Sequence, residues 1–185
     1  MNKAATSKEE ILQASRELLQ ESGQAAVNIR SVASKCDVSV GCIYNYFDSK
    51  ADLIRSTVES IWFDVFHFTE TDSFKNLKEC ITDMYHRMEI GQETYPGFFM
   101  LHSMNFEGER IEDGKMRMQV AWSHIKACLC RVIQNDPNIK HGTFDKNFTP
   151  ESFADLLFSL MLSSMLRQNY DSSHALILTD KMVYA

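Results

Sequence analysis

The segment from Ser39 to Lys50 (SVGCIYNYFDSK) carries the side chains of this sequence that are best suited to contact another molecule. Tyr44 and Tyr46 each hold a hydroxyl on a rigid ring, which suits either a hydrogen bond to a phosphate oxygen or packing in a core. Asn45 carries an amide that can bind an adenine edge through two hydrogen bonds. Lys50 adds a positive charge where a helix is expected to begin, a position that suits a phosphate. The chemistry that these groups favour is noncovalent contact with a nucleic acid.

Two short helices are predicted to position this segment. Apolar residues recur at helical spacing between residues 28 and 36, and Asn28 is suited to cap the helix that they predict. Ser39 is suited to cap a second helix with Ile43 and Phe47 on its buried side. The outward side of that helix holds Gly41, Cys42 and Asn45, with Val40 and Tyr44 beside them. Two short helices joined by a three-residue turn form a helix-turn-helix, whose second helix enters the DNA major groove.

The sequence VSVGCIYNYFDSKADLI resembles the DNA-binding motif of the TetR family of bacterial transcriptional repressors. The shared features are V-S-x-G, an aliphatic residue, Y-x-Y-F, and a lysine that opens the next helix. With the helices on either side, the resemblance covers about residues 7–65. It implies an all-α fold, with an N-terminal three-helix helix-turn-helix domain and a C-terminal helical domain for ligand binding and dimerisation. It also implies a regulator, not an enzyme, that binds a double-stranded DNA operator as a homodimer.

The resemblance places a domain boundary near the start of the fourth helix. We expect a DNA-binding domain at residues 1–50 and an effector-binding and dimerisation domain at residues 51–185, with residues 51–68 as the linking helix. The residues from Ser7 to Glu10 form a capping-box pattern, which predicts a first helix over about residues 8–21. In the family, this helix packs across the helix-turn-helix and braces it.

The motif and the resemblance together give a set of expected DNA contacts. They are Asn28, Arg30, Ser39, Val40, Gly41, Cys42, Tyr44, Asn45, Tyr46 and Lys50. Two positions depart from the family pattern. Asp37 stands where the family commonly has glycine, and aspartate tolerates a left-handed turn less well than glycine does. Val40 stands where a basic or polar residue is common, and its methyl groups suit a thymine methyl.

The net charge of −6 argues against a nucleic-acid binder, but the charges are unevenly distributed. Residues 1–55 hold seven basic and seven acidic side chains, so the whole excess of negative charge lies in residues 56–185. A neutral N-terminal domain can still bind DNA if its few cations face the phosphates. We expect its affinity to depend only modestly on salt.

The composition favours a helical protein of the cytoplasm. Hydrophobic residues make up 44% of the chain, with seven glycines and three prolines, and alternating polar and apolar residues are scarce. No apolar run approaches the roughly 20 residues that span a bilayer, and the N-terminus lacks the apolar core of a signal peptide. The five cysteines lack zinc-finger spacing and suit free thiols in a reducing compartment. We expect no membrane partner and no cofactor.

Beyond residue 68, hydrophobic periodicity predicts helices over residues 74–90, 98–106, 115–134, 151–169 and 173–183. The connections at residues 91–97, 107–114 and 135–148 contain glycine, proline or clustered charges. The helix at 151–169 is apolar on two sides, and only one side can face a domain core. The other side would be exposed in a monomer, so we expect a homodimer through this helix and the last one. A wholly internal helix is the alternative.

The C-terminal part is rich in methionine and aromatic residues, which suit an adaptable pocket for an apolar or aromatic small molecule. The resemblance implies that some of them line an effector site. The candidates are Trp62, Phe66, Tyr85, Met88, Phe99, Met104 and Trp122. The alternative for each of these residues is ordinary core packing.

No metal or catalytic set emerges from the remaining reactive residues. His124 and Cys128 lie four residues apart on one helix face, but Cys130 lies about 200° round the helix from Cys128, so the three cannot converge on a metal. Cys42 is either an oxidation-sensitive thiol or simply a small side chain at that position. The acidic residues between 107 and 113 have no nucleophile or glycine-rich phosphate loop beside them.

The sequence thus predicts a ligand-responsive dimeric repressor of a palindromic operator. The alternative is a helical small-molecule-binding module with a degenerate DNA head, which Asp37, Val40 and the negative charge motivate. A third hypothesis is a helical-bundle enzyme, but the sequence shows no set of catalytic residues to support it.

Overall fold

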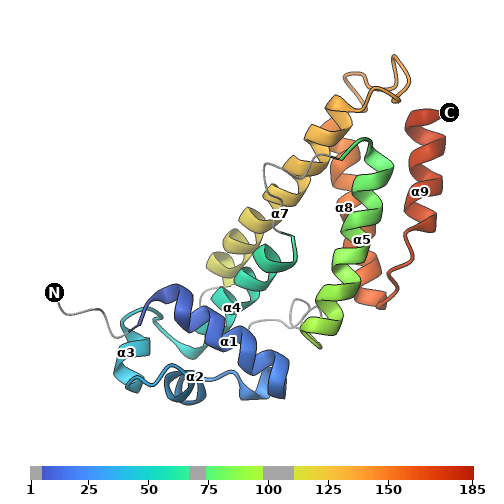
Figure 1. Ribbon diagram of the computed structural model, residues 1–185. Helices are drawn as coiled ribbons and strands as arrows, with labels where there is room; N and C mark the ends of the chain where they lie inside the picture. The colour runs from blue at the N-terminus through green and yellow to red at the C-terminus, as the bar shows by residue number, and fades with distance from the viewer. Residues whose placement is uncertain (1–5, 67–73, 98–110) are drawn as a thin grey trace. The chain divides into compact units, whose positions relative to one another are not determined.

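The computed structural model describes residues 6–66, 74–97 and 111–185, with side chains from residue 119 onward in the last range. In these ranges all regular secondary structure is helical, which confirms the predicted all-α fold (Figure 1). The elements are α1 (Lys8–Ser22), the 3-10 turn η1 (Gln24–Ala26), α2 (Ile29–Lys35), α3 (Val40–Tyr44), α4 (Lys50–Val65), α5 (Leu77–Thr94), α7 (Ile111–Asn135), α8 (Pro150–Arg167), α9 (Ser173–Thr179) and the π-helical turn η2 (Asp180–Tyr184).

The chain divides into two compact units. The first contains Met1–Asp64 and Gly91–Arg117, and the second contains Val65–Ile90 and Met118–Ala185. The first unit therefore includes α1 to α3 and most of α4, together with the segment that ends α5. The second includes most of α5 and α7, and all of α8 and α9.

The first unit begins with the capping box that the sequence predicts. The Glu10 backbone N–H donates to Ser7 Oγ at 3.2 Å, and the Ser7 N–H donates to the Glu10 carboxylate at 2.7 Å. Helix α1 ends at Gly23, whose φ of +74° is a conformation that glycine adopts without steric cost. The buried apolar residues of this unit come from α1 to α4 and the segment between α3 and α4. They include Ile11, Leu19, Val32, Ile43, Phe47, Leu53 and Ile61.

The segment after α5 joins the first unit through Tyr95. The Tyr95 hydroxyl donates to Asp64 Oδ2 at 2.6 Å, and the Tyr95 ring is buried. Burial and the adjacent Asp64 carboxylate raise the pKa of Tyr95, so this residue stays a hydrogen-bond donor over the physiological range. Tyr95 thereby connects the end of α4 to the residues that follow α5.

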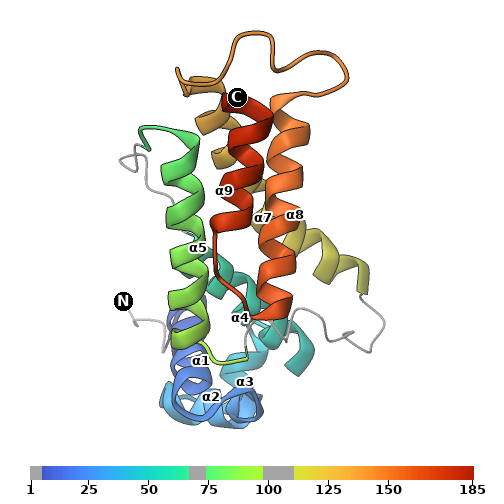
Figure 2. The same cartoon turned by 90° about the vertical axis from the view of Figure 1, so that its right-hand side faces the viewer.

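In the second unit, α5, α8 and α9 run side by side, as both views of the ribbon show (Figures 1 and 2). Helices α5 and α8 each bury an apolar stripe. The buried residues are Leu77, Ile81, Met84, Tyr85 and Met88 from α5, and Phe153, Leu157, Met161 and Met165 from α8. Helix α8 is capped by Thr149, whose side chain accepts the N–H of Ser152 at 3.2 Å.

Two predicted connections are partly helical in the structure. Residues 91–94 continue α5, although Gly91 suggested a break. The Gly91 carbonyl accepts the Tyr95 N–H at 2.9 Å, and the helix ends only before Pro96 and Gly97, where φ is +79°. Residues 111–114 belong to α7 rather than to an acidic loop. Acidic residue types at positions 112 and 113 suit the positive end of a helix dipole in its first turn.

Other predicted boundaries move by a few residues or fall outside the described ranges. Helix α5 starts at Leu77 rather than at residue 74, because the Asn76 side chain accepts the Glu79 N–H at 2.9 Å and caps it there. The short helix expected at residues 98–106 lies outside the described residues.

Candidate nucleic-acid interface

Local hydrogen bonds define the start of the helix-turn-helix at Asn28. Its amide oxygen accepts the N–H groups of Arg30 and Ser31, each at 3.1 Å. In return, the Asn28 N–H donates to the Ser31 hydroxyl at 3.3 Å. The predicted cap is therefore present, and the side-chain oxygen of Asn28 already serves the fold.

The turn between α2 and α3 depends on the left-handed conformation of Asp37. Its φ is +54°, in the region that non-glycine residues enter at a cost, and that aspartate and asparagine enter more readily than most. The Asp37 N–H donates to the Ser34 carbonyl at 3.2 Å, and the Val38 N–H donates to the Ala33 carbonyl at 3.0 Å. Aspartate thus occupies the position where glycine is expected from the family pattern.

Helix α3 has the two sides that its sequence predicts. Ser39 caps it by accepting the Cys42 N–H at 3.3 Å. Ile43 and Phe47 are 0% and 1% exposed and face the core. The outward residues are Val40, Gly41, Tyr44 and Asn45, all exposed, with Cys42 half-buried beside them. Helix α3 therefore presents small, polar and tyrosyl groups to a partner molecule.

Gly41 is not required by the packing of the protein. A Cβ atom built at this position would meet only Ser39 Oγ, at 3.8 Å, which is ordinary van der Waals contact. Glycine also weakens a helix interior relative to alanine. The packing of the described residues therefore gives no reason for a glycine at this position.

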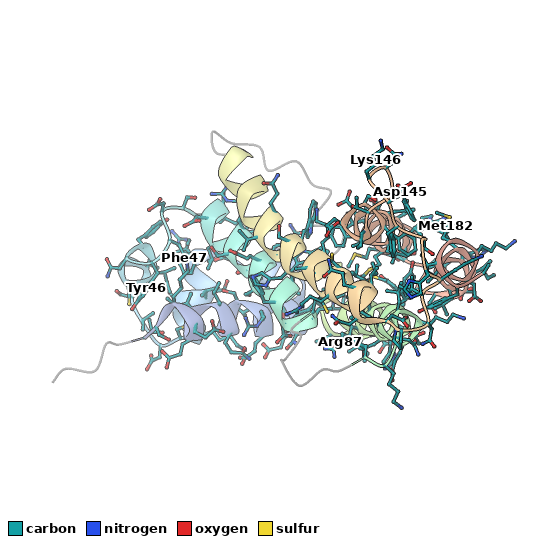
Figure 3. The ribbon with its side chains drawn as sticks, turned by 90° about the horizontal axis from the view of Figure 1, so that it is seen from above. Tyr46, Phe47, Arg87, Asp145, Lys146 and Met182 are labelled. Carbon is teal, nitrogen blue, oxygen red and sulfur yellow. The ribbon has the colours of Figure 1, made fainter. Side chains whose placement is uncertain are left out.

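The two tyrosines of the motif have different roles. Tyr44 is 51% exposed. The Tyr46 hydroxyl donates to the backbone carbonyl of Thr6 at 2.7 Å, and its ring is half-buried. Figure 3 shows Tyr46 beside Phe47, at the end of α3. The sequence did not indicate that Thr6 would accept this hydrogen bond, because no local pattern predicts a contact between residues forty positions apart.

Arg30 and Lys50 are exposed, and neither forms an ion pair within the described ranges. They lie in the first turns of α2 and α4, where helix dipoles also favour an anion. Most other cations of the segment are engaged by carboxylates: Arg16 with Glu9 at 3.3 Å, Lys35 with Glu21 at 2.8 Å, and Arg55 with Asp52 at 4.0 Å. The two unpaired cations flank α3 in the sequence, one on each side.

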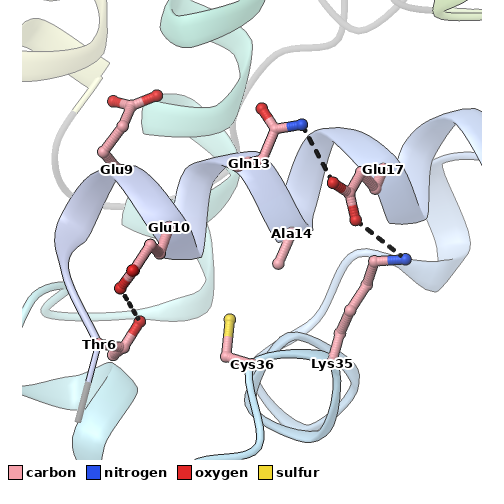
Figure 4. Close-up of a pocket in the computed structure, with 8 residues that line it drawn as sticks. All are labelled: Thr6, Glu9, Glu10, Gln13, Ala14, Glu17, Lys35 and Cys36. Atoms are coloured by element: carbon pink, nitrogen blue, oxygen red, sulfur yellow. Dashed lines mark hydrogen bonds and ion pairs between the residues drawn. The ribbon is translucent and has the colours of Figure 1, made fainter.

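A cleft of about 500 Å³ opens between α1 and the C-terminal end of α2 (Figure 4). It is lined by Thr6, Glu9, Glu10, Gln13, Ala14, Glu17, Lys35 and Cys36. Its charges are largely paired, because Glu17 accepts hydrogen bonds from Gln13 and Lys35, and these lower the pKa of Glu17. Burial raises the pKa of the Cys36 thiol, which opposes thiolate chemistry there. No residue expected to bind an effector lines this cleft.

The expected effector residues are spread over the molecule. Trp62 is 1% exposed and belongs to the first unit, whereas Phe66, Tyr85, Met88 and Trp122 belong to the second. Tyr85 accepts a hydrogen bond from the Ser164 hydroxyl at 3.3 Å, and the Trp122 ring packs 5.5 Å from the ring of Phe158. Phe99 and Met104 lie outside the described residues. These contacts match ordinary core packing as well as a pocket wall.

Within the described ranges, no group of three or more histidine, cysteine or acidic side chains could hold a metal ion. Cys128 is buried and hydrogen bonded to Cys80, while Cys130 donates to the Glu151 carboxylate at 3.5 Å. None of the helices in these ranges combines the length and the apolar character that a bilayer span requires.

Comparison with known proteins places these features in a family. Residues 11–57 match the family model described as bacterial regulatory proteins, tetR family. No curated protein sequence matches the chain significantly.

Three solved structures illustrate the similarity of fold. BioQ with its double-stranded DNA operator has a TM-score of 0.58 at 14% identity, covering 96% of this chain and 98% of that one. A Rhodococcus sp. RHA1 protein proposed to be a transcriptional regulator has a TM-score of 0.68 at 13% identity, covering 95% and 94%. SmeT, the repressor of the Stenotrophomonas maltophilia multidrug efflux pump SmeDEF, has a TM-score of 0.54 at 17% identity, covering 88% and 79%.

At these identities the solved structures establish the fold, and the family model covers the helix-turn-helix itself. The family consists of DNA-binding regulators rather than enzymes. The motif, the capped pair α2–α3, the matching model and the shared fold agree. Residues 11–57 thus match the tetR family of bacterial regulatory proteins, and the chain shares its fold with the three solved structures.

Proposed function

We propose that this protein binds a palindromic DNA operator as a homodimer and represses transcription until a small molecule releases it. One observation carries the proposal. The outward side of α3, with Tyr44 and Asn45 exposed, lies in sequence between unpaired cations at the N-terminal turns of α2 and α4. Side chains on α3 would read base edges, while Arg30 and Lys50 would bind the phosphates on either side.

The proposal assigns the DNA-binding domain to residues 1–50 and the effector-binding and dimerisation domain to residues 51–185. Asn45 suits adenine, Val40 suits a thymine methyl, and Gly41 lets the sugar–phosphate backbone or a base edge approach closely. Asn28 and Ser39 would contribute mainly as helix caps, since their side-chain oxygens already accept backbone N–H groups. A repressor of this kind works in the cytoplasm, where the bacterial chromosome lies.

A dimer is supported by exposed apolar side chains in the second unit. Leu156 and Leu166 on α8 are 41% and 58% exposed. Ile177 on α9 and Met182 on η2 are 54% and 40% exposed. At 100° per residue, the two leucines lie about 80° apart around α8, on the side that carries Ser159 and Ser163. A second copy of the chain would remove this surface from water, and a two-fold axis would present two α3 helices to one duplex.

The effector is proposed to be apolar or aromatic and to bind among the buried methionine and aromatic residues of residues 51–185. Met88 is fully buried, and Trp62 and Phe66 lie at the end of α4. A ligand would release the operator only if it binds the DNA-free arrangement of the dimer more tightly than the DNA-bound one.

The test is selection of bound sequences from randomised duplex DNA, followed by a gel shift with the selected sequence and a shuffled control at about 100 mM salt. We expect an inverted repeat whose half-sites are centred about one DNA turn apart, or slightly more. Arg30→Ala and Lys50→Ala should weaken binding to both duplexes, whereas Asn45→Ala should relax preference at one base pair. Salt-sensitive binding without sequence preference would instead favour a small-molecule-binding module with a degenerate DNA head.

Salt dependence gives a second, quantitative test. Arg30 and Lys50 of each subunit would supply four phosphate contacts in a dimer, which predicts a slope of about −3 to −4 for log affinity against log salt. Lys8→Ala should leave this slope unchanged, because the Lys8 ammonium lies 5.6 Å from the centroid of the Phe47 ring. A slope near −8 would show that cations assigned here to intramolecular pairs contact DNA.

A further inference from the structure

We propose that Tyr46 is a positioning residue, which holds the reading helix α3 in register with α1 through the backbone carbonyl of Thr6. The inference rests on the proposed function, because it concerns how α3 is presented to DNA. It changes the role expected for Tyr46, from a direct DNA contact to a link within the protein.

The link joins residues that are far apart in sequence. The Tyr46 hydroxyl donates to the Thr6 carbonyl at 2.7 Å, an ordinary length for a well-formed hydrogen bond from an O–H donor. Thr6 is 5% exposed, so this bond is largely screened from water. Tyr46 itself lies two residues after the last residue of α3, and its N–H donates to the Ile43 carbonyl at 3.0 Å.

Thr6 is held on its other side by the start of α1. The Thr6 hydroxyl donates to Glu10 Oε2 at 3.1 Å, as the dashed line in Figure 4 shows. The same carboxylate oxygen accepts the Ser7 N–H at 2.7 Å, and Ser7 Oγ accepts the Glu10 N–H. The position of the Thr6 carbonyl is therefore determined by the capping box of α1 rather than by a free chain end.

A second contact between the same elements lies next to the first. Phe47 is 1% exposed, and the Lys8 ammonium lies 5.6 Å from its ring centroid. The start of α1 thus meets the end of the reading helix at two consecutive residues, Tyr46 and Phe47. This matters because α3 has only five residues, Val40–Tyr44, and a helix of that length has little stability of its own.

The hydrogen-bonding capacity of Tyr46 argues against a direct phosphate contact. A tyrosine hydroxyl has one proton, and here that proton is donated to Thr6. A phosphodiester oxygen only accepts hydrogen bonds, so it cannot use the remaining lone pairs of the hydroxyl. Tyr44 keeps its exposed hydroxyl for that purpose, while Tyr46 determines where Tyr44 and Asn45 lie. Base readout through paired hydrogen bonds tolerates only a small displacement of such side chains.

The test compares Tyr46→Phe, Thr6→Val, their double variant and Thr6→Ser in the full-length dimer. Affinity is measured for the selected operator and for the shuffled duplex. Tyr46→Phe removes only the hydroxyl, Thr6→Val removes the bond to Glu10 at nearly constant shape, and Thr6→Ser restores it. We expect each of the first two to weaken operator binding about five- to tenfold, with little change on the shuffled duplex. The double variant should lose less than the product of the single losses, and Thr6→Ser should bind like wild type.

The opposite results would overturn the inference. If Tyr46→Phe weakens binding while Thr6→Val does not, or if the two losses multiply, the hydroxyl acts directly on DNA. If both variants unfold more easily but keep the ratio of operator to shuffled affinity, the link only stabilises the fold.

A readout without DNA separates this inference from the proposed function. Amide exchange at residues 46 and 47 should be faster in Tyr46→Phe and in Thr6→Val than in wild type or Thr6→Ser. If wild type shows no operator preference, the proposed function fails, and the exchange rates still decide whether the link between α1 and α3 exists. Equal amide exchange rates in wild type, Tyr46→Phe, Thr6→Val and Thr6→Ser would show that the link between α1 and α3 does not exist in solution.

Discussion

At the scale of single residues, Gly41 and Asp37 differ in whether the fold explains the residue type found there. Gly41 has room for a side chain, so the fold does not require glycine there, and close approach by DNA is the role proposed for it. Asp37 has a φ of +54°, so its conformation serves the turn that connects α2 to α3. Substitutions of Gly41 should therefore mainly change operator affinity, and substitutions of Asp37 should mainly change stability.

Gly41→Ala should leave the protein folded and stabilise it by about 0.5–1 kcal/mol, because alanine is the better helix former. The added methyl should nevertheless weaken operator binding by about tenfold, since it lies on the outward side of α3. Urea unfolding and a gel shift measure the two effects. Ser34→Ala, at an exposed position of α2, is the control and should change neither by much. An unchanged operator affinity in Gly41→Ala would show that DNA does not approach this side of α3.

Asp37→Gly should stabilise the protein by up to about 1 kcal/mol, because glycine enters the left-handed region without steric cost. Asp37→Val should destabilise it by about 1–3 kcal/mol, since a branched side chain is strained at a positive φ. Thermal unfolding of the two variants against wild type measures the difference. Equal stability of the valine and glycine variants would mean that the turn is not left-handed in solution.

At the scale of elements, Asp136 joins the start of α5 to the end of the chain. Its carboxylate is 7% exposed and accepts hydrogen bonds from the Leu77 N–H at 2.8 Å, from the Tyr184 hydroxyl and from the Asn138 N–H at 2.9 Å. Burial alone raises the pKa of Asp136, but these hydrogen bonds outweigh it and lower the pKa below its ordinary value. The ionised form is therefore favoured in the folded protein.

A lowered pKa in the folded state stabilises the protein above the unfolded pKa of about 4. This contribution is lost as the pH falls through the lower folded value. Asp136→Asn should therefore cost about 1–3 kcal/mol at pH 6 and progressively less below pH 4. Urea unfolding from pH 3 to pH 6 measures it, with Asp155→Asn as the control. Asp155 is exposed and pairs with Lys126, so its substitution should cost less than about 1 kcal/mol. A pH-independent difference between Asp136→Asn and wild type would contradict this assignment.

At the scale of the whole molecule, the proposed dimer would bury the exposed leucines of α8, Leu156 and Leu166. Leu166 is 58% exposed and lies on the same side of α8 as Leu156. Burial of such a side chain in a dimer contributes about 1–2 kcal/mol.

Leu166→Glu should therefore convert the dimer to monomers without unfolding them, and should weaken operator binding at least tenfold at a fixed protein concentration. Sedimentation analysis with circular dichroism measures the assembly and the fold. Ile90→Glu on α5 is the matched control, because Ile90 is 46% exposed but lies on another helix. A Leu166→Glu protein that remains dimeric would place the dimer interface elsewhere.

Features encoded within a few residues could be predicted from the sequence. The capping box of Ser7 and Glu10, the caps at Asn28 and Ser39, and the buried side of α3 depend on side chains that meet backbone groups of their own turn. The unexpected helical residues 91–94 show the limit of such reasoning. The local signal of Gly91 was outweighed by its place in a helix whose end is anchored when Tyr95 binds Asp64.

The sequence by itself determined the helical fold, the helix-turn-helix and the outward set of residues on α3, because hydrophobic periodicity and capping act over one or two turns. Only the tertiary structure decided which of two similar tyrosines has its hydroxyl bonded within the protein. Tyr46 meets Thr6 across forty residues, and such a contact depends on how separate helices pack. Only the tertiary structure decided which cations are paired within the protein. Lys35 forms ion pairs with α1 carboxylates, whereas Arg30 and Lys50 remain exposed.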